Sequence, residues 1–86
     1  MQHDAKNKDA SLNKLIYMAN QIGKAFALRS SDEAVREIAT HIKKFWEKRM
    51  LAQIFDHVEA GGAGLDALPR QALQSLSSKS GRVTAS

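Results

Sequence analysis

The stretch that decides the fold is residues 42–50, which read IKKFWEKRM. Apolar residues before and within it recur at helical spacing and form one stripe: Val35, Ile38, Ala39, Ile42, Phe45 and Trp46. Those that follow form a second stripe: Met50, Leu51, Ile54, Phe55 and Val58. In one unbroken helix the stripes would be rotated by more than about 100° from each other, so one neighbour would not bury both. The sequence therefore predicts a break or kink near Trp46 to Lys48, although neither Gly nor Pro marks it.

Helical patterns also precede this stretch. Ser30 and Glu33 are spaced as a capping box, which predicts the start of the helix that leads to the break. Upstream, an earlier helix is expected from about Leu12 to Leu28, with Ser11 as its N-cap. Its apolar stripe is Leu12, Leu15, Ile16, Ala19, Ile22 and Phe26. Tyr17 and Leu28 fall on the opposite side of that helix, where burial in a core does not explain them.

A glycine-rich turn and a fourth helix are expected downstream. Residues 61–64 read GGAG, which is typical of a helix C-cap because glycine adopts the left-handed conformation at little steric cost. The stretch lacks the spacing of a phosphate-binding loop and follows no strand. Asp66 is a suitable N-cap, and Pro69 fits the first turn of a helix. The apolar side of that helix would be Leu65, Leu68, Ala72, Leu73 and Leu76.

The predicted fold class is all-α, a compact bundle of three to four short helices with disordered N- and C-terminal tails. Residues 1–10 are expected to be a disordered lead-in, because they offer almost nothing to bury. Residues 11–76 form the expected helical bundle domain. Residues 77–86, rich in serine, are expected to be a disordered tail.

Composition narrows the classes of protein and site. The chain has 86 residues and no cysteine, which favours a single domain and excludes disulfides and thiolate chemistry. Its longest apolar run, about Leu15 to Ala19, is too short for a signal peptide or a membrane span. We therefore expect a cytoplasmic protein without a membrane partner.

Nucleic acid is a weaker alternative as a partner. The formal net charge is +4, and the two helices around the break leave open a small helix-turn-helix-like DNA-binding regulator. The turn lacks the usual glycine, however, and no platform of aromatic and basic residues accompanies the charge. The chain is thus not expected to bind nucleic acid.

Few residues suggest chemistry of their own. The histidines, His3, His41 and His57, include no pair at the helical spacing of a metal site. Asp56 and Glu59 share a helix face, but exposed charges explain them better than acid–base work. No catalytic, cofactor-binding or metal-binding residue is predicted, so the chain is not expected to be an enzyme by itself.

Docking onto a partner is the expected activity. Trp and Arg dominate binding hot spots, although the aromatics of residues 42–50 also suit a core. Asn20 lies at the edge of its apolar stripe, where its amide would bond either a neighbouring loop or a partner backbone. The predicted partner-binding residues are Tyr17, Asn20, Gln21, Trp46, Arg49 and Met50.

Three motifs in this order resemble one known family. They are LIYMANQI at residues 15–22, FWEKRM at 45–50 and GGAGL at 61–65, followed by a short Leu-rich helix. The chain is similar, over about residues 12–76, to the delta subunit of soluble NAD-dependent, molybdenum-containing formate dehydrogenases. That family often has W-[DE]-P-R-M, whereas Lys48 stands at the proline position here, so the sharpness of the break is open.

The resemblance implies a role and a set of partners. Such a chain would be a non-catalytic accessory subunit of an enzyme that oxidises formate to CO₂ and reduces NAD. It would bind the catalytic alpha subunit and support cofactor insertion or assembly. The molybdenum cofactor, iron–sulfur clusters and FMN would lie on partner subunits, with none on this chain.

Overall fold

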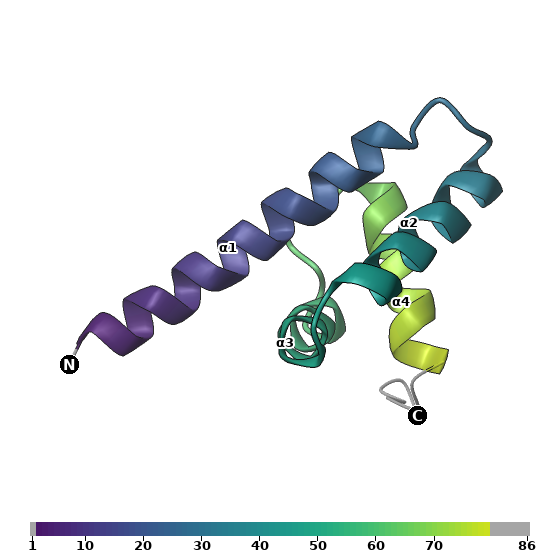
Figure 1. The fold of residues 1–86 in the computed structure, drawn as a ribbon. Coiled ribbons are helices and arrows are strands. Elements are labelled where there is room, and N and C mark those ends of the chain that lie inside the picture. Colours follow the sequence, from purple (N-terminus) through teal and green to yellow (C-terminus); the bar gives the residue numbers. More distant parts are fainter. Residues whose placement is uncertain (1, 80–86) are drawn as a thin grey trace.

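Residues 2–79, the part of the chain whose backbone the structure describes, fold into four helices joined by short connections (Figure 1). The computed structural model describes the backbone of residues 2–79 and the side chains of residues 11–79. The helices are α1 (Gln2–Ala25), α2 (Ser31–Phe45), α3 (Lys48–Glu59) and α4 (Ala67–Lys79). No strand occurs within these described residues, and the all-α prediction is confirmed.

The break between α2 and α3 falls where the two apolar stripes predict it. Helix α2 ends at Phe45, and the N–H of Trp46 still donates to the carbonyl oxygen of Ile42 at 2.9 Å. Trp46 (φ −90°, ψ 140°) and Glu47 (φ −73°, ψ 158°) are both extended. Helix α3 starts at Lys48. Two extended residues therefore separate the helices, without glycine or proline.

The helix starts agree only in part with expectation. The Ser30 hydroxyl accepts a hydrogen bond from the Glu33 N–H at 3.3 Å, so the predicted cap of α2 is confirmed. Helix α1 begins at Gln2, well before the expected start at Leu12. Residues 2–10 contain neither Gly nor Pro and several good helix formers, so nothing in the backbone stops the helix there. Of the expected C-terminal tail, residues 77–79 belong to α4, and residues 80–86 lie outside the described residues.

The core lies where all four helices meet. It consists of Leu15, Ala19, Ala34, Ile38, Ile42, Trp46, Ile54, Phe55, Val58, Leu65, Ala72 and Leu73. Except for Ala34, these residues belong to the predicted stripes, and most other stripe residues pack partly buried against them. The exception is Phe45, expected in the core but 64% exposed. Because α2 ends there, its ring lies against His41 instead, with the ring centroids 4.7 Å apart.

The packing order of the helices sets which surfaces remain open. In Figure 1, α2 turns back beside the C-terminal half of α1, and α3 lies below this pair, seen end-on. Helix α4 packs against α2 over its most extensive interface and also touches α1 and α3. One flank of α2 therefore borders α1, and the other borders α4. Among the described helices, none combines the length and apolar character needed to cross a membrane.

Candidate functional site

A shallow depression of about 400 Å³ lies where α1, the end of α2 and the start of α3 converge. We call it the aromatic hollow, and it is lined by Tyr17, Met18, Gln21, Ile22, His41, Phe45, Trp46 and Met50. Helix α1 contributes two successive turns of one face, because the four residues it supplies are spaced i, i+1, i+4 and i+5. The break after Phe45 brings Trp46 and Met50 to the same depression. Residues from three separate elements thus form one surface.

Two large rings of the hollow are open to solvent. Tyr17 is 63% exposed and Phe45 is 64% exposed, whereas Met18, Ile22, His41 and Met50 are half-buried around them. Monomeric proteins seldom leave several large apolar side chains exposed side by side without a use. The methionines add flexible, polarizable groups that adapt to a binding partner. The hollow has the composition of a protein–protein contact rather than of a reaction site.

Cations and a second aromatic contact border the hollow. The Lys44 ammonium lies 5.6 Å from the centroid of the Phe45 ring, and the ring of Phe26 lies 6.4 Å from that of His41. The Arg29 guanidinium lies 5.6 Å from the centroid of Phe26. Such cation–π contacts place positive charge along the rim of an apolar surface. A complementary partner would present an apolar centre with carbonyl or carboxylate groups around it.

Four of the six predicted docking residues meet in this hollow: Tyr17, Gln21, Trp46 and Met50. Trp46 is only 7% exposed, so most of its ring belongs to the core and one edge reaches the hollow. Arg49 lines an adjacent depression, which shares Met18 and Met50 with the first. The exposed side chain of Arg49 is therefore at the border of the hollow rather than inside it.

Asn20, the sixth predicted residue, makes two bonds inside the molecule. Its Nδ2 donates to the carbonyl oxygen of Gly64 at 2.9 Å, and its Oδ1 accepts from the N–H of Asp66 at 2.9 Å. Of the two uses that the sequence left open, the structure shows the bond to a neighbouring loop. Asn20 thereby attaches α1 to the glycine loop, which we define as residues 60–66.

His57 holds the same loop from α3. Its Nε2 lies 2.7 Å from the carbonyl oxygen of Ala63, and because a carbonyl only accepts, this nitrogen carries the proton. Within the loop, Gly61, Gly62 and Gly64 all have positive φ, at 123°, 67° and 87°. The predicted glycine cap is therefore confirmed, and the loop is held on both sides. His57 is occupied by this contact and does not converge with other ligating groups.

Chemistry-bearing groups do not gather elsewhere in the described part of the chain. No group of three or more His, Asp or Glu residues among the described ones is placed to hold a metal ion. Glu59 accepts a hydrogen bond from the Ser77 hydroxyl at 3.2 Å, which joins α3 to α4. The side chain of His3 lies outside the described side chains.

The sequence alone missed four residues of the hollow, namely Met18, Ile22, His41 and Phe45. The sequence did not identify Met18 and Ile22, because they lie at the edge of the apolar stripe of α1, where a residue borders both the core and solvent. Phe45 has a core-facing angle on the helical wheel, so only knowledge of the helix end reveals its exposure. His41 carries no distinctive spacing, and its place follows from the ring of Phe45 one turn later.

The chain was compared with protein families, with curated proteins and with solved structures. A family model described as the NADH-dependent formate dehydrogenase delta subunit FdsD matches residues 14–73. The matched span includes the whole aromatic hollow, the break between α2 and α3 and the glycine loop. Neither the curated proteins nor the solved structures contain a significant match.

Proposed function

Because the chain belongs to the delta subunit family of NADH-dependent formate dehydrogenases, we propose that it is a non-catalytic accessory subunit of that enzyme. In this proposal the aromatic hollow binds the catalytic alpha subunit, which oxidises formate to CO₂. The observation that carries the proposal is the pair of exposed rings, Tyr17 and Phe45, on a surface built from three elements.

The residues of the hollow suit a stable contact. Large aromatic side chains bury much apolar area at low cost in side-chain entropy, so a few of them supply most of the binding free energy. Tyr17 and Phe45 are already exposed, and the half-buried methionines that line the same hollow would follow the shape of a partner. Gln21 in the hollow and Arg49 at its border would add polar contacts that fix orientation.

The proposed subunit works in the cytoplasm by supporting assembly of the alpha subunit, including insertion of its cofactor. The molybdenum cofactor, the iron–sulfur clusters and the FMN belong to partner subunits in this proposal. This chain contributes a rigid surface, since Asn20 and His57 fix the glycine loop and thus the packing of α1 against α3 and α4.

Co-expression with the alpha subunit tests the docking surface. The double variant Tyr17→Ala/Phe45→Ala removes both exposed rings, whereas Leu28→Ala is the matched control, because Leu28 is 101% exposed and lies outside the hollow. Loss of two hot-spot side chains should weaken binding by about tenfold or more. The readouts are the amount of alpha subunit that co-purifies with the tagged chain and the molybdenum content of that subunit.

The two readouts separate docking from assembly. Reduced co-purification with the double variant, and normal co-purification with Leu28→Ala, would support the docking surface. Equal recovery with both variants would show that the alpha subunit binds elsewhere. If the double variant binds the alpha subunit weakly but that subunit still has its full molybdenum content, the assembly role would be contradicted and the docking surface would not.

A further inference from the structure

A second surface lies on the other flank of α2, where α4 packs beside it. This groove of about 260 Å³, here called the basic groove, is lined by Val35, Arg36, Ala39, Thr40, Lys43, Ser75, Leu76 and Lys79. At 100° per residue, Arg36 and Lys43 are rotated by roughly 170° around α2 from the pair His41 and Phe45. The basic groove and the aromatic hollow therefore occupy opposite faces of one helix.

The charges of the groove have one sign. Arg36, Lys43 and Lys79 are exposed, and no acidic residue is among the described residues that line it. Within residues 11–79, none of these three cations forms an ion pair, even though Asp32 and Glu33 lie about one turn before Arg36. Three unpaired cations around one groove make a site for a ligand with several negative charges.

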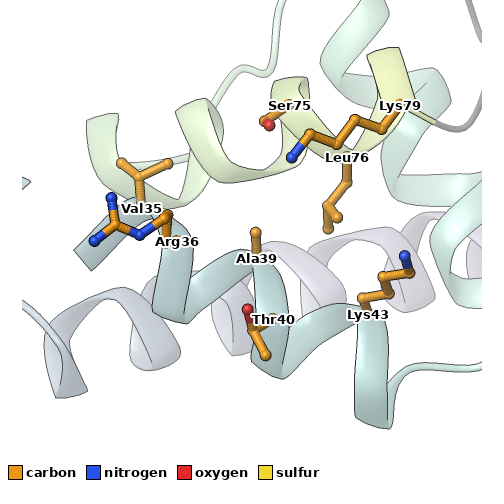
Figure 2. A pocket seen from close by; sticks show the side chains of 8 residues that line it. All are labelled: Val35, Arg36, Ala39, Thr40, Lys43, Ser75, Leu76 and Lys79. Carbon is orange, nitrogen blue, oxygen red and sulfur yellow. The ribbon is translucent and has the colours of Figure 1, made fainter. Parts of the chain in front are cut away.

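The floor of the groove is apolar. Val35, Ala39 and Leu76 are half-buried there, and in Figure 2 the side chain of Leu76 points from α4 toward Ala39 on α2. An inorganic anion or a phosphate chain would leave this floor uncovered. An apolar side chain placed between negative charges would cover it and contact the cations at the same time.

The spacing of the cations indicates an extended segment. Figure 2 shows Arg36 and Lys43 at opposite ends of the groove, with Lys79 reaching from α4 back toward Ser75 between them. Lys43 is seven positions after Arg36 in helix α2, which corresponds to a rise of about 10.5 Å. In an extended chain, residues i and i+4 lie on one side, about 13 Å apart, with i+2 between them. The long Arg and Lys side chains cover the small difference.

We propose that the basic groove binds an extended acidic peptide segment of a protein partner, with carboxylates at positions i and i+4 and an apolar residue at i+2. The i+2 side chain lies on Val35, Ala39 and Leu76. The two carboxylates pair with Arg36 and Lys43, and Lys79 contacts the segment from α4. The inference does not depend on the proposed function, because it uses none of the residues of the aromatic hollow.

Peptide titration of the full 86-residue chain tests the proposal. The probe is a capped peptide with the core Glu-Ser-Leu-Ser-Glu. Its binding is monitored by the backbone amide chemical shifts of the protein in two-dimensional NMR. Saturable shifts are expected in residues 35–43 and 75–79 and not at Tyr17 or Met50. A peptide with Gln for both Glu residues, and one with Ser for Leu, should each bind at least about fivefold more weakly.

Matched charge variants locate the site on the protein. Lys43→Gln/Lys79→Gln should weaken binding of the probe by about fivefold or more. Lys24→Gln/Lys48→Gln removes the same charge from exposed positions outside the groove, and its Kd should stay within about twofold. Equal weakening by both pairs would mean that only the overall charge attracts the peptide, and the proposal would be wrong.

Two other outcomes would overturn the inference. If the Gln peptide binds as well as the Glu peptide, the carboxylates are not recognised. If duplex DNA with the same charge as the peptide changes the amide chemical shifts of residues 35–43 and 75–79 at a lower concentration than the peptide does, the groove is a nucleic-acid surface instead. Both measurements are made at about 50 mM salt and repeated at about 200 mM, where screening weakens charge-dependent binding.

Discussion

Gly23 of α1 lies directly against the ring of Pro69 in α4. A methyl group at Gly23 would be 2.9 Å from Cδ and 3.2 Å from Cγ of Pro69, closer than packed carbon atoms approach. Both residues are buried. The absence of a side chain at Gly23 therefore permits the contact between the first and the last helix, and this contact helps to position the face of α1 that lines the aromatic hollow.

Gly23→Ala should lower the free energy of unfolding by up to about 2 kcal/mol. Alanine favours a helix over glycine by about 1 kcal/mol, but forcing a methyl group into a packed interface costs about 1–3 kcal/mol, and the proline ring has little freedom to move. Denaturant unfolding of the full chain measures the change. In a Pro69→Ala background the same substitution should be neutral or stabilising, and an equal loss in both backgrounds would show that Pro69 is not the obstacle.

Asn20→Ala should lower the free energy of unfolding by about 1–2 kcal/mol, because it removes both bonds to the glycine loop at Gly64 and Asp66. Gln21→Ala is the control, since Gln21 is exposed and a change there should stay within about 0.5 kcal/mol. Thermal or urea unfolding gives both values. If Asn20→Ala leaves stability unchanged yet weakens co-purification of the alpha subunit, then Asn20 acts at the partner surface instead.

Lys48→Pro should be neutral or stabilise the protein by up to about 1 kcal/mol. Lys48 is the first residue of α3, where proline is favoured, and Glu47 before it is already extended, as a residue before proline prefers. Ala52→Pro is the contrasting variant. Proline at this exposed position inside α3 should lower the free energy of unfolding by about 3 kcal/mol or more. Urea unfolding measures the change. A large decrease in the free energy of unfolding with Lys48→Pro would mean that α3 does not start at Lys48.

The sequence predicts the helices and the core because both depend on local periodicity. The break at Trp46 and Glu47 follows from the rotation between two apolar stripes, and the cap at Ser30 follows from spacing alone. Phe45 shows where this reasoning fails, because its angle on α2 suits the core while its position at the helix end exposes it. Periodicity does not say which neighbour covers the last turn of a helix.

The candidate site depends on contacts that are distant along the chain. Asn20 and Gly64 are 44 positions apart, so the sequence identified an unusual amide but not its partner. Trp46 and Tyr17 were both selected as docking residues, yet one is mostly in the core and the other is mostly in solvent. The basic groove was not predicted, because its cations come from two helices whose pairing is set only by the tertiary fold.

Photo-crosslinking from Tyr17 tests the docking claim most directly. A photoreactive benzoylphenylalanine replaces Tyr17 in one sample and the still more exposed Leu28 in another, each co-expressed with the alpha subunit of formate dehydrogenase. Since Tyr17 lines the aromatic hollow and Leu28 does not, irradiation should join the chain to the alpha subunit from position 17 and not from position 28. A crosslink from position 28 alone, or equal crosslinks from both, would contradict the aromatic hollow as the docking surface.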